Sequence, residues 1–191
     1  LGYHAPSGHR LRGPMNLEAF DQAFREVVRR QEAFRTAIVA SDGGFVQRID
    51  ETVEFGLLPP TDLSGLPPAQ REQALLDDMN RRTAMPYQHD RGPLARDSQY
   101  KLDNDHHALF LMAHHILWDG WSFDIFYAEM AVLYEAFEQG RPSPLTPLAV
   151  GHGDFAAWHT RWMQSEEIGQ QTAHWKRRLG TPRPRPEAHL D

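Results

Sequence analysis

Apolar side chains near the start of the chain recur at the spacing of one helix face: Leu17, Phe20, Phe24, Val27 and Val28. Asn16 stands directly before them, and asparagine is among the residue types that most often cap a helix N-terminus. The spacing therefore predicts a first helix of about four turns that begins after Asn16 and buries its apolar face.

Four later stretches also favour helices. Pro67 and Pro68 open the first of them, because proline suits a first helical turn. The second covers residues 122–139 and stops at Gly140. The last two are shorter and lie around residues 154–164 and 166–179. The expected buried side chains of the first two are Leu75, Leu76, Met79, Ile125, Met130, Leu133 and Phe137.

Strand signals lie between these helices. A turn at residues 41–44 separates two short runs, 36–40 and 45–49, as in a β-hairpin. Residues 53–58 are expected to add a further strand. The polar triplet 103–105 separates residues 95–102 from 106–113, and the second of these runs is almost wholly apolar. We therefore expect 106–113 to be a strand that is buried on both faces.

The order of elements predicts an α/β (α+β) two-layer sandwich with a mixed sheet covered by helices. Residues 1–180 are expected to form one lobe, and the proline-rich residues 181–191 the start of a linker. The start of the chain lacks an initiator methionine and a signal-peptide pattern, so the chain is expected to come from a longer protein.

Composition narrows the class of function. The net charge is −6 and no basic run contains stacking aromatic residues, so nucleic acid is not an expected partner. No apolar run approaches the ~20 residues of a membrane span. The absence of cysteine excludes disulfides and thiol catalysis. A cytoplasmic protein is the resulting expectation.

The residues best suited to chemistry lie between the apolar strand and the long helix. The segment from His114 to Ser122 reads His-His-Ile-Leu-Trp-Asp-Gly-Trp-Ser. A histidine whose one ring nitrogen binds a backbone carbonyl keeps the other as an acceptor near neutral pH. Asp119 is expected to orient the histidine or to pair with an arginine. Gly120 is expected to leave room near the reacting atoms and to allow a positive φ.

Other interpretations of this segment stay open. A histidine beside an apolar strand is more often a structural residue than a catalyst. A metal site would use His and Asp four residues apart, but no third ligand is placed by spacing, so no metal is expected. His106 and His107 are read as ordinary strand residues. Ser122 lacks the flanking glycines of a nucleophile elbow and is expected to cap the following helix.

The segment closely resembles the HHxxxDG motif of nonribosomal peptide synthetase condensation domains, members of the chloramphenicol acetyltransferase-like superfamily. Other segments resemble family motifs in the same order. They are residues 30–36 (RHExLRT, with Gln31 in place of histidine), 90–96, 154–158 (DYAxW, with Phe155 in place of tyrosine) and the proline-arginine stretch 182–186.

The resemblance implies the N-terminal lobe of such a domain. The family's opening SxAQxR motif is missing, and so is everything after the linker between the lobes. A complete condensation domain has two similar lobes, with the active site in a tunnel between them. The implied partners are therefore the C-terminal lobe, adjacent synthetase domains, and donor and acceptor carrier proteins. The fragment alone is expected to have impaired activity.

The resemblance also implies a reaction. Two carrier proteins deliver thioesters on phosphopantetheine arms, and the acceptor amine attacks the donor carbonyl to form an amide. No cofactor is bound directly. His115 matches the catalytic histidine, which acts as general base or positions the amine. His114 and Asp119 match structural positions. Arg35 and Arg96 are candidate ion-pair partners of Asp119, and an arginine of the missing lobe is an equal alternative.

The remaining motif residues are expected to support the loop. Gly120 matches the motif glycine near the reacting carbonyl, and Ser122 follows it at the helix start. Trp118 and Trp121 are expected to pack around the loop and not to contact substrate.

Three functions are compatible with these motif residues. The first is amide formation. The second is a noncatalytic module that docks carriers or recruits a partner, in which the motif histidine is usually altered. The third keeps the fold but performs epimerisation, or ester formation by acyl transfer to a hydroxyl group. The intact His114, His115 and Asp119 favour an enzyme.

Overall fold

The structure is a computed structural model that describes residues 2–57 and 59–180. Within it the chain divides into two units, one that ends at His152 and one that begins at Gly153. The expected linker, residues 181–191, lies outside the described residues. Each unit is described by itself.

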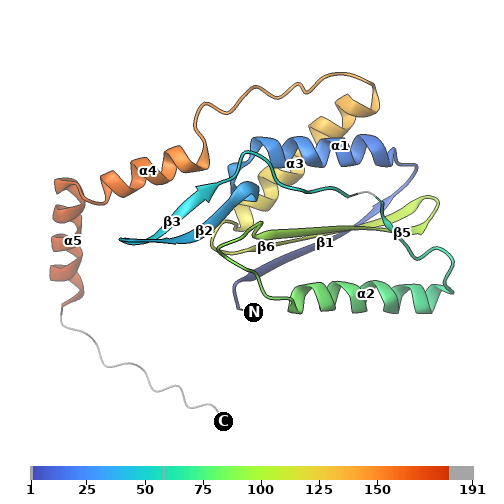
Figure 1. The fold of residues 1–191 in the computed structure, drawn as a ribbon, viewed down its shortest axis with the longest axis horizontal. Helices are drawn as coiled ribbons and strands as arrows, with labels where there is room; N and C mark the ends of the chain where they lie inside the picture. Colours follow the sequence, from blue (N-terminus) through green and yellow to red (C-terminus); the bar gives the residue numbers. More distant parts are fainter. Residues whose placement is uncertain (1, 58, 181–191) are drawn as a thin grey trace, which may run out of the picture. The chain divides into compact units, whose positions relative to one another are not determined.

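A four-stranded mixed sheet forms the centre of the first unit, with the strand order β1-β6-β5-β4 (Figure 1). β1 and β5 pair with β6 in antiparallel fashion, and β4 pairs with β5 in parallel. A separate hairpin joins β2 and β3. The strand bounds are β1 His4–Arg12, β2 Thr36–Ser41, β3 Gly44–Ile49, β4 Thr61–Asp62, β5 Ala95–Asp103 and β6 His106–His114.

Helices cover both faces of the sheet. In Figure 1, α1 and α3 lie over one face and α2 lies over the other. A short 3-10 helix, η1, separates α1 from β2. The helix bounds are α1 Leu17–Arg30, η1 Glu32–Arg35, α2 Pro68–Ala84 and α3 Gly120–Glu138. The expected mixed sheet covered by helices is confirmed, and α2 adds a third layer to it.

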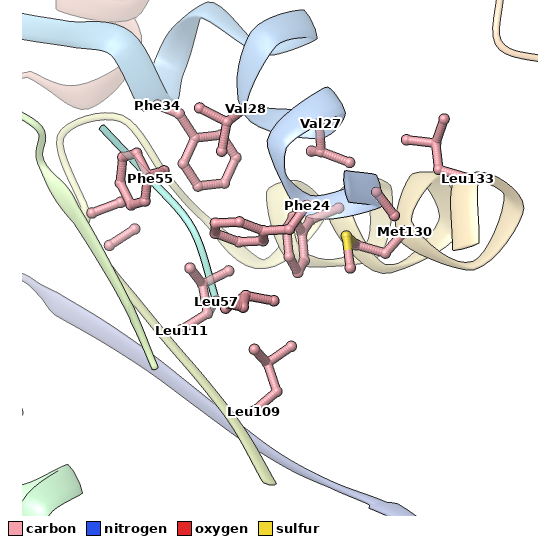
Figure 2. Close-up of a cluster of buried hydrophobic side chains, with 14 of the residues drawn as sticks. Phe24, Val27, Val28, Phe34, Phe55, Leu57, Leu109, Leu111, Met130 and Leu133 are labelled. Carbon is pink, nitrogen blue, oxygen red and sulfur yellow. The ribbon is translucent and has the colours of Figure 1, made fainter. Parts of the chain in front are cut away.

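The first helix begins as its sequence predicts. The Asn16 side chain accepts a hydrogen bond from the Ala19 amide at 3.1 Å, which satisfies one of the free N–H groups of the first turn. The apolar face of α1 is buried. Figure 2 shows Phe24, Val27 and Val28 directed toward side chains from the sheet and from α3.

Two cores lie on opposite faces of β6. Alternate residues Leu109, Leu111 and Ala113 join the cluster under α1 and α3. Figure 2 labels the first two of them. Residues Ala108, Phe110 and Met112 join a second cluster with Leu75 of α2. A strand with an apolar side chain at nearly every position suits this double burial, as its sequence predicts.

Several expectations about the elements are wrong. Residues 53–57 form no strand, although Phe55 and Leu57 are buried in the core under α1. Leu58 lies outside the described residues. Leu76 of α2 and Ile125 of α3 were expected to be buried, but 45% and 51% of their surfaces are exposed. No pattern predicted β1, because its sequence contains Pro6, Gly8 and charged residues and shows no strict alternation.

The second unit consists, in its described part, of two helices. α4 covers His152–Trp162, so its first residue still belongs to the first unit, and α5 covers Glu166–Leu179. The Ser165 side chain accepts a hydrogen bond from the Ile168 amide and so caps α5. Both helices agree with the spacing of the sequence. No helix in residues 2–57 or 59–180 has the length and apolar character that crossing a membrane requires.

Candidate active site

The histidine motif forms a tight turn between the central strand and the long helix. His114 is the last residue of β6, and α3 begins six residues later at Gly120. The Leu117 amide donates to the His114 carbonyl at 3.1 Å, which closes a β-turn with His115 at its first corner. The expected strand–turn–helix setting is confirmed, and it places His115 at the end of a buried strand.

The side chain of His115 is exposed, whereas its backbone is fixed. Its amide donates to the Tyr3 carbonyl at 2.7 Å, at the start of the chain beside β1. The neighbouring amide of Ile116 donates to the His114 ring at 3.1 Å. A side chain that is free to meet another molecule therefore stands on a backbone held by its neighbours.

His114 is held among aromatic rings and is partly buried. It stacks on Tyr3 at 6.1 Å between ring centroids and meets Tyr87 edge-on at 5.7 Å. Its Nε2 atom lies 3.1 Å from Nε2 of His89. Burial, followed by the nearby rings of His89 and His4, lowers the pKa of His114, so the ring favours its neutral form.

The backbone contact of His114 differs from the sequence-based expectation. A ring nitrogen was expected to donate to a carbonyl, but Nδ1 of His114 instead accepts from the Ile116 amide. This arrangement resembles an Asx-turn, in which a side-chain acceptor binds the amide two residues further along.

Asp119 caps α3. Its carboxylate accepts hydrogen bonds from the Ser122 amide at 2.9 Å and from the Ser122 hydroxyl at 2.8 Å. The Asp119 amide donates in return to the Ser122 hydroxyl, which completes a capping box. These hydrogen bonds from Ser122 lower the pKa of Asp119. Ser122 thus contributes to the cap as expected, but the N-cap residue itself is Asp119.

Neither arginine that was expected to pair with Asp119 does so in the described structure. Arg35 donates to the carbonyl oxygens of Asp50 and Arg29. Arg96 donates to the Met85 carbonyl at 2.6 Å and to the Pro86 carbonyl. The physical reason is that carbonyl groups of α1, after β3 and after α2 already accept from the two guanidinium groups, while the helix cap uses the Asp119 carboxylate.

The two tryptophans of the motif differ. Trp118 is buried and packs edge-on against Phe34, with 4.9 Å between ring centroids, as expected. Trp121 was also expected to pack, but 77% of its surface is exposed. Like Gly120, Trp121 lies in the first turn of α3. Ile116 and Ile125, which lie nearby in the chain, are each about half exposed. The side chains of Ile116, Trp121 and Ile125 together leave an apolar surface around the motif.

Gly120 does not adopt the positive φ that was expected of it. It is the first helical residue of α3, and a Cβ atom added there would meet no other atom within 4 Å. Its lack of a side chain therefore leaves open space beside the turn and does not relieve any crowding. The structure thus shows open space at Gly120, while the expected positive φ is wrong.

A small cavity of about 150 Å³ lies behind the turn, between α3, η1 and His152. Ser122 and Ile125 of α3 line one side of it, and Gln31 and Ala33 line another. The cavity adjoins the cap of α3, so the surface of the first unit is concave next to the motif.

His106 and His107 lie at the other end of β6, as ordinary strand residues. Burial lowers the pKa of His107. No group of three or more His, Cys, Asp or Glu side chains within residues 2–57 and 59–180 is arranged to hold a metal ion.

Sequence comparison matches residues 2–187 to the family model of the condensation domain. Malpibaldin synthetase of Mortierella alpina is 36% identical over 201 residues, which cover 96% of this chain and 3% of that protein. Bacitracin synthase 3 of Bacillus licheniformis is 32% identical over 175 residues, which cover 92% of this chain and 2% of that protein. The chain therefore spans only a small part of the length of these relatives.

Solved structures give the same result. The first condensation domain of the calcium-dependent antibiotic synthetase has a TM-score of 0.77 and 27% identity, over 95% of this chain and 43% of that one. The X-domain from teicoplanin biosynthesis, solved in complex with OxyB, has a TM-score of 0.83 and 26% identity, over 96% of this chain and 39% of that one.

Proposed function

Because the chain belongs to the condensation domain family, we propose that it is the N-terminal lobe of such a domain and takes part in amide bond formation. The chain spans only 39% and 43% of two solved relatives, which agrees with one lobe of two. The single observation that carries the proposal is His115, an exposed imidazole on a fixed turn at the end of a buried strand.

His115 acts on the acceptor amine. The ring takes a proton from the ammonium group, or holds the neutral amine in line, and the lone pair of the neutral nitrogen then forms a bond to the donor thioester carbonyl. Collapse of the tetrahedral intermediate breaks the carbon–sulfur bond, the nitrogen loses a further proton, and the sulfur takes up a proton, so that the donor arm leaves as a thiol. A general base contributes typically ~10²–10⁴-fold, and alignment of two tethered reactants can contribute up to ~7–11 kcal/mol.

The substrates are proposed to arrive on the phosphopantetheine arms of donor and acceptor carrier proteins. The exposed apolar side chains beside His115, namely Ile116, Trp121 and Ile125, support a site that is completed by another surface. We assign that surface to the C-terminal lobe, so that the tunnel between the lobes is closed on both sides. Adjacent synthetase domains are the source of the carriers.

A second candidate function is a noncatalytic module that recruits a partner protein. The observation in its favour is the similarity to the X-domain that was solved in complex with OxyB. Epimerisation and ester formation on the same fold are further alternatives, and both would use the same turn. The intact pair His114 and His115 favours amide formation over recruitment.

The experiment measures transfer between a loaded donor carrier and a loaded acceptor carrier, followed by intact-protein mass spectrometry. The complete domain, its His115→Ala variant and residues 1–191 alone are compared. His106→Ala is the matched control, since it removes a histidine from the other end of the same strand.

Amide product from the complete domain and from His106→Ala, with a loss of ~10²-fold or more in His115→Ala, supports the proposal. Equal transfer by the complete domain and by His115→Ala contradicts the role of His115. Binding of a partner without transfer by any carrier pair would favour the recruitment module.

A further inference from the structure

We propose that His89 is a positioning residue, which fixes the ring of His114 and through it the turn that carries His115. This inference rests on the proposed function of His115. It starts from the contact between two Nε2 atoms that lie 3.1 Å apart, one from the end of β6 and one from the loop that precedes β5. Two imidazole nitrogens at this distance share one proton, so one must donate and the other must accept.

The direction of this hydrogen bond follows from the other side of the His114 ring. Nδ1 of His114 accepts the Ile116 amide hydrogen at 3.1 Å, so this nitrogen carries a lone pair and no proton. A neutral imidazole has one protonated nitrogen, which must then be Nε2. Nε2–H of His114 therefore donates to His89, and Nε2 of His89 accepts. The two rings stand nearly perpendicular, at 82°, with their centroids 4.6 Å apart.

The backbone around His89 is fixed from several sides. The His89 carbonyl accepts from the Ile38 amide of β2 at 2.7 Å. Just before it in the chain, the Tyr87 hydroxyl donates to the Met112 carbonyl at 2.9 Å, and the Arg96 guanidinium lies 4.1 Å from the centre of the Tyr87 ring. The acceptor nitrogen of His89 is thus presented by a segment that is attached to β2, β5 and β6.

The effect reaches His115 through one amide group. His114 binds the Ile116 amide, and Ile116 follows His115 directly in the turn. Without His89, the Nε2–H group of His114 loses this acceptor, and the ring is free to turn or to move its proton to Nδ1. Either change removes the acceptor for the Ile116 amide. Because misplacement of a reacting group by ~1 Å can cost ~10²-fold in rate, even a partial loosening of the turn is measurable.

The test uses the complete domain with His89→Leu and His89→Gln. Leucine removes the acceptor, whereas the glutamine side-chain oxygen can accept from His114 in its place. His9→Leu is the matched control, because His9 is an exposed histidine of β1 whose ring contacts Ser7 and Tyr127. Two properties are measured: kcat and KM for transfer between loaded carriers, and the ¹⁵N NMR shifts of the His114 ring, which distinguish the two tautomers.

We expect His89→Leu to lower kcat by ~10-fold to 10²-fold with little change in KM, and to lose the signal of the Nε2–H tautomer of His114. His89→Gln restores both, and His9→Leu changes neither. An unchanged kcat in His89→Leu, or a His114 tautomer that is the same in all variants, overturns the proposal. If the unaltered domain transfers nothing, the proposed function fails, and the NMR spectra alone decide whether His89 orients His114.

Discussion

Asp97 provides a quantitative test of how this core tolerates a carboxyl group. It lies on β5 opposite Leu111 of β6, and the residue is half-buried. Burial raises the pKa of Asp97 to about 7; the charge of Asp21 on α1 also raises it, while Arg82 and Arg25 act in the opposite direction. The folded protein therefore favours the protonated acid.

The size of the effect follows from linkage. Because a tenfold change in proton affinity is worth about 1.4 kcal/mol, a pKa of about 7 in place of 3.8 costs about 4 kcal/mol of stability at high pH. The folded state holds a proton that the unfolded state releases above pH ~4. The cost is therefore absent below the unfolded pKa and complete once the pH has risen through the folded pKa. Between pH 5 and pH 8, the loss is about 3 kcal/mol.

Asp97→Asn removes the ionisable group and keeps a similar shape. We expect the variant to be more stable than the unaltered chain at pH 8, with an advantage that is about 3 kcal/mol smaller at pH 5. Urea unfolding at each pH, followed through the tryptophan fluorescence to which the buried Trp118 contributes, measures this difference. Asp42→Asn in the exposed β2–β3 turn is the control. A free energy of unfolding that changed with pH in the same way in the unaltered chain and in Asp97→Asn would refute the reasoning.

Substitutions at three more positions test the site and the core. Asp119→Ala should cost about 1 kcal/mol in unfolding experiments and Asp119→Asn much less, because asparagine also caps helices; equal losses would contradict the capping role. Phe34→Ala should lower the free energy of unfolding by ~3–5 kcal/mol, because Phe34 is 1% exposed and packs among several aromatic rings. A loss below about 1 kcal/mol would show that neighbouring side chains move into the cavity. Trp121→Ser should change thermal stability by less than ~0.5 kcal/mol despite the size of the side chain, and a large loss would mean that Trp121 is covered.

The sequence predicted those parts of the fold in which local pattern and burial agree. The first helix has a capping asparagine and an unbroken apolar face, and β6 is apolar on both sides. Residues 53–57 show the limit of such reasoning. Phe55 and Leu57 are apolar and buried, but the Leu57 amide donates to the side chain of Asp21 at 2.5 Å and not to a neighbouring strand. No local sequence pattern reveals that the Asp21 carboxylate of α1 accepts the hydrogen bond of the Leu57 amide.

The candidate site was predicted to a similar extent. The strand–turn–helix setting of His115 and the burial of Trp118 follow from the order of apolar and polar residues. The partners of the polar groups do not. His89 lies 25 residues before His114 and has no recognisable spacing to it, so its contact depends on the fold of the intervening chain. Asp119 was free to bind either an arginine or its own helix, and the local hydrogen bonds prevail.

The pairing of β1 also determines when, during synthesis, the turn that carries His115 can be completed. Ala5 lies opposite Ala113, more than one hundred residues later in the chain, and the Tyr3 carbonyl holds the amide of His115. At a synthesis rate of ~5–20 residues per second, the first strand waits on the order of 5 to 20 seconds before its partner leaves the ribosome. Its proline, glycine and charged residues suit that wait, because such a sequence is a poor template for unwanted pairing. The turn that carries His115 can therefore be completed only by residues synthesised more than one hundred positions earlier.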